Sequence, residues 1–354
     1  MGISRYNKHK KYKHLPMIFV YSAAHFAVDF ACAFLMFRSI SQSPDWYLCI
    51  LLYNFCAFAM QMPMGILADK LNRNFLFAAI GCIAVAAAYG FGHNHNLVAA
   101  AVIIGLGNGM FHIGGGIDIL NISEEKSGAL GIFVSPGAFG VYFGTILGKG
   151  TVLPFLPVIL TLIISAGLIF AVYFIQFGAY LANEEFSLEK INSPQIFASI
   201  ICLFLVVCLR SYVGLALNFP WKSSGYWGIL LVCAVVFGKI AGGFAADRFG
   251  AYKTAFFSLG IAAVLYLFPK IPAAGILAVL LFNMTMPVTL WLMSKIFPKA
   301  KGFSFGLLTF ALFIGFLPVH FGAVISSILL PTVFAVISII LLWIGMIMIR
   351  KAKT

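Results

Sequence analysis

The chain has 354 residues and a composition that excludes a soluble globular domain. Hydrophobic residues make up 62% and charged residues only 9%, so too few polar side chains remain to cover a water-exposed surface. The net charge of +13 would suit a nucleic-acid-binding protein, but most of the basic residues lie in the tails and loops on one side of the apolar runs, which argues against that class.

Apolar runs long enough to cross a bilayer recur along the whole chain. About 20 helical residues span the hydrocarbon core, which is roughly 30 Å thick. We therefore predict an all-α polytopic membrane protein with twelve transmembrane helices in two pseudo-symmetric six-helix bundles. The predicted spans are Leu15–Phe37, Trp46–Ala68, Phe75–Gly92, Leu97–Asn121, Gly128–Gly148, Val152–Leu181, Gln195–Leu217, Gly225–Ala246, Tyr252–Phe268, Pro272–Ser294, Gly302–Ser326 and Ile328–Ile349.

The basic residues predict the orientation of these spans. Both termini and the even-numbered loops share one side, which holds 17 of the 23 Lys and Arg, whereas the opposite side holds Arg38, Lys149, Lys222 and Lys270. By the positive-inside rule both termini are then cytoplasmic, and the protein is a multi-pass protein of the cell membrane, inner or plasma. The partner of the surplus charge is anionic inner-leaflet lipid and not nucleic acid. We expect a monomer.

One connection differs in composition from the others. Residues 183–194, between the sixth and seventh spans, are polar, and Pro194 suits the first turn of a new helix. We therefore divide the chain into an N-terminal bundle (1–182), a cytoplasmic linker (183–194) and a C-terminal bundle (195–354).

The same short motif occurs after the second and the eighth spans. Gly65–Arg73 reads GILADKLNR and Gly243–Gly250 reads GFAADRFG, which places Asp69 and Asp247 178 residues apart. Repetition at half the chain length predicts two related halves. In membrane proteins built this way, a site between the halves opens to each side in turn, as transport requires.

These two motifs resemble the hallmark sequence of the major facilitator superfamily, Gly-x-Leu-Ala-Asp-Arg-x-Gly-Arg-Arg/Lys. The first copy matches at Gly65, Leu67, Ala68, Asp69 and Arg73, with Lys70 in place of the first Arg and Asn72 in place of Gly. Asn is the usual substitute for Gly in a left-handed turn. The second copy matches at Gly243, Ala246, Asp247, Arg248, Gly250 and Lys253.

The resemblance implies a cytoplasmic gate in which the carboxylate meets a helix N-terminus and neighbouring cations. We therefore assign Asp69, Lys70, Arg73, Asp247 and Arg248 to gating. Two further residues are assigned to this gate from their positions along the chain. These are Lys239, eight residues before Asp247, and Asp118, near the cytoplasmic end of the fourth span.

A weaker similarity points to the fosmidomycin-resistance type of efflux protein. The residues that carry it are His25 with Asp29, Phe111-His112, and Arg210-Ser211. The fourth span departs from that pattern, because Ile113-Gly114-Gly115-Gly116 replaces Pro-Glu-Gly. In the fifth span, Gly131-x-x-x-Ser135-Pro136-x-x-x-Gly140 partly matches an antiporter motif, which favours efflux over uptake.

Ionisable residues inside the spans mark the predicted cavity. Such groups cost about 2.5–3.5 kcal/mol each on insertion scales and so indicate function. His25 and Asp29 are four residues apart and share a helix face, so together they can bind and release a proton. Arg210 can present a fixed charge to an anionic solute group or neutralise Asp29, and His112 can line the cavity. We expect proton-coupled transport of a small organic solute by alternating access.

Three other functions compete with this one. His25, Asp29 and His112 could carry a divalent metal ion as ligands, since imidazole and carboxylate suit first-row ions. A non-transporting membrane sensor is another alternative. An enzyme is not expected, because the spans lack His-Glu-x-x-His and Gly-x-Ser-x-Gly motifs, and no cofactor is expected. Finally, Gly114–Gly116 predicts an unwound stretch in the fourth span, because glycine weakens a helix.

Overall fold

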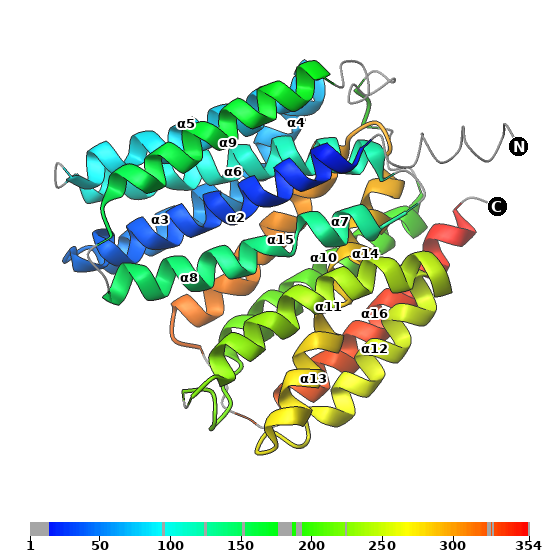
Figure 1. Cartoon of the computed structure of the whole chain (residues 1–354). Coiled ribbons are helices and arrows are strands. Elements are labelled where there is room, and N and C mark those ends of the chain that lie inside the picture. The colour runs from blue at the N-terminus through cyan, green and yellow to red at the C-terminus, as the bar shows by residue number, and fades with distance from the viewer. Residues whose placement is uncertain are drawn as a thin grey trace, which may run out of the picture.

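The computed structural model describes residues 14–93, 96–123, 126–150, 153–175, 186–188, 193–223, 225–323, 327 and 329–352. All regular structure in these residues is helical (Figure 1). The elements of the first half are α2 (Leu15–Arg38), η1 (Ile40–Gln42), α3 (Trp46–Asn54), η2 (Phe55–Ala59), α4 (Gln61–Leu71), α5 (Asn74–His93), α6 (Leu97–Ile122), α7 (Gly128–Phe133), α8 (Pro136–Gly150) and α9 (Phe155–Ile175). Those of the second half are α10 (Pro194–Ala216), α11 (Trp227–Phe249), α12 (Ala251–Leu265), α13 (Pro272–Asn283), α14 (Thr285–Ile296), α15 (Lys301–His320) and α16 (Leu330–Lys351).

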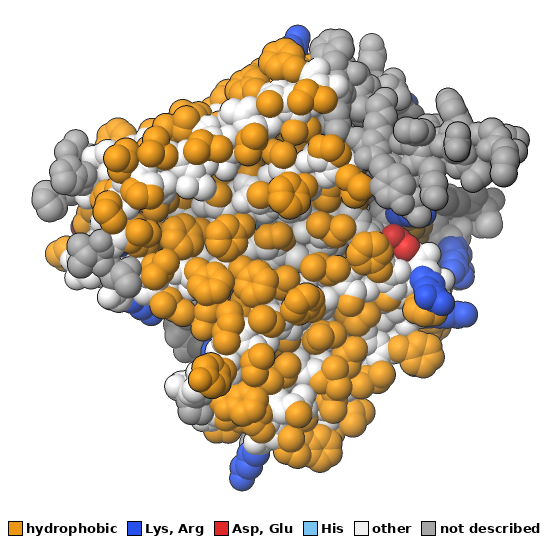
Figure 2. Space-filling view, in the orientation of Figure 1, with side chains coloured by type: hydrophobic (Ala, Val, Ile, Leu, Met, Phe, Trp, Pro, Cys, Tyr) orange, Lys and Arg blue, Asp and Glu red, His pale blue; other side chains and the backbone are white. Residues whose placement is uncertain are grey.

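The described helices fit a multi-pass membrane protein. Eleven helical segments are long and apolar enough to cross a bilayer. The predicted ninth span, Tyr252–Phe268, corresponds to α12, which has 15 residues. At 1.5 Å per residue α12 is about 22 Å long, shorter than a full crossing. Hydrophobic side chains cover the visible flank of the helices, and Lys and Arg lie near its edges (Figure 2).

Helix packing repeats between the two halves. In the first half α2 packs against α8 and α9, and α5 packs against α6 and α9. In the second half α10 packs against α15 and α16, and α12 packs against α13 and α16. In each half, the first span therefore packs against the fifth and sixth spans, and the third span packs against the fourth and sixth. Helices α2 and α16 begin and end the described chain at the same end of the bundle (Figure 1). Most of the predicted linker 183–194 lies outside the described residues.

Three spans are interrupted, but not the one that the sequence predicts. A π-helical turn, η2, interrupts the second span, the fifth span breaks between α7 and α8, and the tenth breaks at Met284. The expected unwinding at Gly114–Gly116 is wrong, because α6 runs without interruption through this segment. Neighbouring groups fill the space beside these glycines, so they serve close packing.

The two halves meet along two seams. Helix α4 packs against α15, and α7 and α8 pack against α11. At the first seam a Cβ on Gly65 would overlap the backbone of Gly302. At the second, a Cβ on Gly243 would press on the backbone of Ser127 and Gly128. The motif glycines therefore let the helices of opposite halves touch at their backbones.

Candidate functional site

The centre of the candidate site is a pair of residues on α2. His25 and Asp29 lie one helical turn apart, and His25 Nε2 is 3.2 Å from Asp29 Oδ2. Both side chains point into the protein, with side-chain exposures of 7% and 14%. A buried carboxylate of this kind needs a counter-charge or hydrogen-bond donors. The structure thus brings together the pair that the sequence predicts.

Helix α6 adds His112 and Asn108 to the pair. His112 Nε2 is 2.9 Å from His25 Nε2 and 3.8 Å from Asp29 Oδ1. The Asn108 amide donates a hydrogen bond of 3.0 Å to Asp29 Oδ1. We call His25, Asp29 and His112 the triad. The sequence predicted His112 in the cavity, but it did not single out Asn108. Asn108 lies one turn before His112 on α6.

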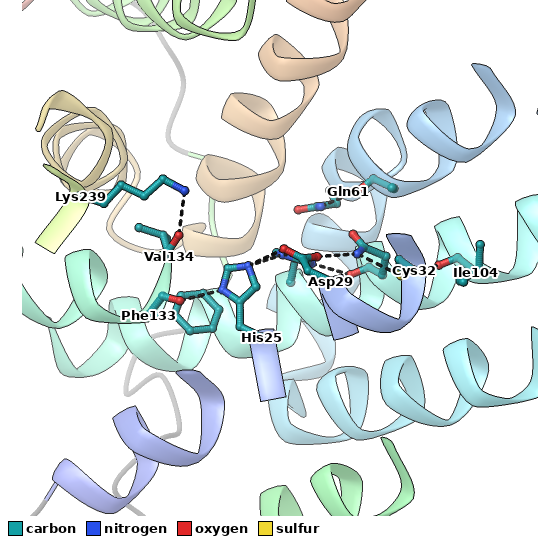
Figure 3. A network of polar contacts seen from close by, with 11 residues as sticks. His25, Asp29, Cys32, Gln61, Ile104, Phe133, Val134 and Lys239 are labelled. Atoms are coloured by element: carbon teal, nitrogen blue, oxygen red, sulfur yellow. Dashed lines mark hydrogen bonds and ion pairs between the residues drawn. The ribbon is translucent and has the colours of Figure 1, made fainter. Parts of the chain in front are cut away.

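The break in the fifth span supplies the next part of the site. Pro136 has no N–H, and the Ala138 N–H, which in an unbroken helix would bond to the Val134 carbonyl, donates instead to Ser135. The Phe133 carbonyl accepts a 2.7 Å bond from His25 Nδ1. The Val134 carbonyl accepts a 3.0 Å bond from Lys239 Nζ of the second half (Figure 3). Two successive backbone carbonyls at this helix break thus join the triad to the other half.

These contacts fix where hydrogen atoms lie on the two imidazoles. His25 Nδ1 faces the Phe133 carbonyl and His112 Nδ1 faces the Asn108 carbonyl at 2.9 Å, and a carbonyl can only accept. Both Nδ1 atoms therefore carry hydrogen. The two Nε2 atoms then face each other and the Asp29 carboxylate. Two lone pairs and a carboxylate repel one another, so a proton or another cation has to lie among these three atoms.

Two cations in the interior of the spans, Arg210 and Lys239, lie in the second half. Arg210 of α10 is 9% exposed, donates to Thr289 Oγ1 at 3.2 Å, and lines a cavity between the halves. It makes no ion pair with Asp29 among the described contacts, so Asp29 is balanced by the imidazoles instead. Lys239 was expected at the inner gate. It donates a bond to the Val134 carbonyl at the helix break, and its gate role stays a prediction.

Asp118 lies inside the first half. Its Oδ2 accepts a 2.5 Å bond from Tyr21, and its Oδ1 accepts a 3.1 Å bond from Asn74. The side chain is 2% exposed and joins α2, α5 and α6. Both partners belong to the same half, and the gate role expected for Asp118 stays a prediction. The sequence shows that Asp118, Tyr21 and Asn74 are polar residues in or next to apolar spans. Their spacing along the chain does not show that they contact one another.

The two motif carboxylates each cap a helix of the opposite half. Asp69 accepts bonds from the backbone N–H groups of Gly302 (2.8 Å) and Phe303 (2.9 Å) at the start of α15. Asp247 accepts bonds from the N–H groups of Ser127 (2.6 Å) and Gly128 (3.0 Å) at the start of α7. Carboxylates at helix N-termini are favoured by the unpaired N–H groups and the helix dipole. We call these contacts the Asp69 clasp and the Asp247 clasp.

The motif cations take no part in the clasps among the described residues. Lys70 lies over the ring of Phe186 at 5.6 Å, and Arg248 lies over that of Phe249 at 5.4 Å. Arg73 is exposed. Asn72 has φ 48°, the left-handed turn that its place in the motif predicts. The gating role of the motif residues stays a prediction.

Comparison with known proteins gives matches at the level of structure. No protein-family model and no curated protein sequence matches the chain. The E. coli fucose:proton symporter matches with a TM-score of 0.64 and 14% identity over 94% of this chain and 99% of that one. A human organic anion transporter matches with 0.69 and 12% over 94% and 99%. A bacterial homologue of the iron transporter ferroportin, in an outward-facing state, matches with 0.65 and 14% over 97% and 100%.

These matches run over nearly the full length of each protein, and a further one, at a TM-score of 0.61, is a transporter of the major facilitator superfamily in its outward conformation. Sequence identities this low indicate a shared fold, but they do not indicate a shared substrate. Together with the repeated helix packing and the two clasps, they show that this chain has the fold of the major facilitator superfamily.

Proposed function

We propose that the chain is a secondary transporter that moves a small organic solute across the cell membrane, coupled to protons, by alternating access. The observation that carries the proposal is the triad, in which two Nε2 atoms 2.9 Å apart face a carboxylate and require a cation between them. A proton is the smallest cation that meets this need, and histidine releases protons near neutral pH.

The arrangement of the halves supports alternating access. Both clasps are closed at the end of the bundle where α2 begins, while a cavity lies between the halves on the side of Lys222, in the connection from α10 to α11. The fucose:proton symporter shows that this fold can couple a solute to protons. We propose export as the direction of transport, because the fifth span partly matches an antiporter motif. We also propose that both termini are cytoplasmic and that the protein acts as a monomer.

Proteoliposomes with a trapped pH-sensitive dye test the proposal. A solute panel is added under an imposed pH gradient, and solute-dependent proton movement is recorded. We expect Asp29→Asn to abolish this signal while the protein still inserts and folds, because the amide cannot balance the shared proton. Asp45→Asn is the control, since Asp45 is exposed in the loop after α2. Unchanged proton-coupled flux in Asp29→Asn would remove the triad from the mechanism.

A divalent metal ion as the transported solute is the second candidate. The three ligand atoms of the triad lie within 4.8 Å of one another, and both histidines bond through Nδ1 to backbone carbonyls. Metal-binding histidines are commonly oriented by this kind of contact. At constant pH, Mn²⁺, Co²⁺ or Zn²⁺ would then raise the melting temperature of the purified protein, and His25→Ala would remove the effect. Stabilisation that survives in His25→Ala would exclude the triad as the metal site.

A further inference from the structure

We propose that the transported solute is an organic anion whose acidic group binds Arg210 in the cavity between the halves. This inference rests on the proposed transport function and names its substrate class. The distribution of charge around the cavity supports an anionic solute. The triad is balanced within the first half, whereas Arg210 is buried in the second half and makes no ion pair with a described carboxylate. Lys239 is half-buried and makes no ion pair within 4.0 Å among the described residues either.

The cavity has the size and lining of a small-molecule site. Its volume is about 550 Å³, within the range of 300–1,000 Å³ that is usual for ligand pockets. Its polar lining includes Arg210, Lys222, Tyr142, Thr145 and Asn283, and no Asp or Glu is among the described residues that line it. Lys222 is exposed and Arg210 is buried, so a solute that enters past Lys222 meets positive charge both at the rim and in the interior.

Arg210 is left with unused hydrogen-bond donors. A guanidinium has five N–H groups, and the one protein partner that the described residues give it is Thr289 Oγ1. The side chain is 91% buried, and no described carboxylate lies within ion-pair distance of it. A buried charge without a counter-charge is unfavourable. A planar acid bound in bidentate fashion would satisfy the free donors and supply the missing charge.

Lys239 reinforces this excess of positive charge. Its ammonium group bonds to the Val134 carbonyl, which offers a partial charge but not a full negative one. Ala138, next to the triad-contacting Gly137, lines the cavity itself, so the cavity and the triad share the wall formed by the start of α8. A cationic solute would meet Arg210 and Lys222 without any acid to receive it, whereas an anionic solute is attracted at each point.

The rest of the lining indicates the body of the solute. Valine, leucine, isoleucine and phenylalanine side chains from α8, α10, α11 and α13 form most of the wall. Such walls favour the apolar surface of a ligand, because binding removes that surface from water. The geometry therefore points to an amphipathic monoanion, an acidic group on an apolar body.

A matched pair of probes tests the charge requirement. Purified full-length protein is heated with 2-naphthoate or with the neutral 2-naphthamide, and a panel of further aryl and alkyl carboxylates is run with the corresponding amides. We expect carboxylates, and not amides, to raise the melting temperature, because only a ligand of the folded form stabilises it. Arg210→Gln should weaken carboxylate binding about tenfold or more, the usual effect of losing charge-assisted hydrogen bonds. Arg38→Gln, an exposed arginine away from the cavity lining, should bind as the parent does.

A second measurement leaves Arg210 in place, so that a folding defect cannot hide the result. In Thr145→Cys, the reaction rate of the new thiol is compared for an anionic and a cationic methanethiosulfonate reagent, and the rates of the parent protein are subtracted. A positive cavity predicts that the anionic reagent reacts several-fold faster, relative to a free thiol in solution. An equal ratio, or a preference for the cationic reagent, would overturn the inference.

The outcomes separate this inference from the transport proposal. Amides that bind as well as carboxylates, or a panel in which no carboxylate binds, would overturn the anion site and leave proton-coupled transport standing. Carboxylate binding that Arg210→Gln weakens, without solute flux in proteoliposomes, would support the anion site and contradict transport.

Discussion

Asp69 and Asp247 are reciprocal, because each accepts backbone N–H bonds from the first turn of a helix in the opposite half. Asp69 reaches from the first half to α15, and Asp247 reaches from the second half to α7. Both contacts lie at one end of the helical bundle, one on each seam. A separation of the halves at this end would have to break both clasps, so we expect both clasps to contribute to the free energy of opening.

Loss of one clasp charge should open this end of the protein. We expect Asp69→Asn to shift the population toward the open state by about tenfold or more, since hydrogen bonds to a charged group are worth about 1.5–3 kcal/mol. Hydrogen–deuterium exchange at Gly302 and Phe303, which lose the carboxylate acceptor, measures the change directly. Exchange at Ser127 and Gly128 should rise as well, because both clasps open in one motion.

Asp45→Asn serves as the control for this measurement, since Asp45 is exposed and distant from both clasps. Faster exchange confined to Gly302 and Phe303 would contradict a single gate, because it would show that the two seams open independently.

The sequence predicted the coarse fold from simple physical signals. Bilayer thickness sets the length of apolar runs, and the repeated motif around Asp69 and Asp247 revealed the two halves. The pair His25 and Asp29 followed from helix periodicity alone. These features are local, so one stretch of sequence contains all the information that they need.

The contacts that the sequence could not predict join distant segments of the chain. Lys239 lies eight residues before a gate residue, and it bonds to the Val134 carbonyl at the helix break of a different span. Asp118 finds Tyr21 and Asn74 within its own half. The three glycines of α6 do not unwind it, because close packing against neighbouring helices offsets their weak helix propensity. None of these partners is marked by spacing along the chain.

The shared proton of the triad can be counted by NMR. With ¹⁵N-labelled histidine and no metal present, His25 and His112 together should show three protonated ring nitrogens out of four, because both Nδ1 atoms donate to carbonyls and one proton lies between the Nε2 atoms. A bound divalent metal would leave two. In the variant His112→Gln the His112 signals are missing, so the spectrum of this variant distinguishes the His25 signals from those of His112. Two protonated nitrogens in metal-free protein would contradict the shared proton.

Asp118 should matter for stability and not for coupling. Its carboxylate is fully enclosed and satisfied by Tyr21 and Asn74. We expect Asp118→Asn to lower the free energy of unfolding by about 1–3 kcal/mol, the cost of disrupting buried bonds to a charged group, with a smaller loss in Tyr21→Phe. Thermal melting measures both variants. Flux per folded molecule should keep its dependence on pH, and a change in that dependence would return Asp118 to the transport mechanism.

Gly137 offers a way to disturb the triad without altering any of its members. A Cβ at this position would overlap the Asp29 carboxylate and His25 Nε2, so Gly137→Ala should force the triad apart. Overpacking of this kind costs about 1–3 kcal/mol, and we expect proton-coupled flux to fall about tenfold or more. Gly167→Ala on α9 is the matched control, because its Cβ would meet nothing within 4 Å. The readouts are dye-reported proton movement and the histidine NMR signals. Normal coupling in Gly137→Ala with shifted His25 signals would show that triad geometry does not control transport, since the added methyl would then have moved the triad without effect.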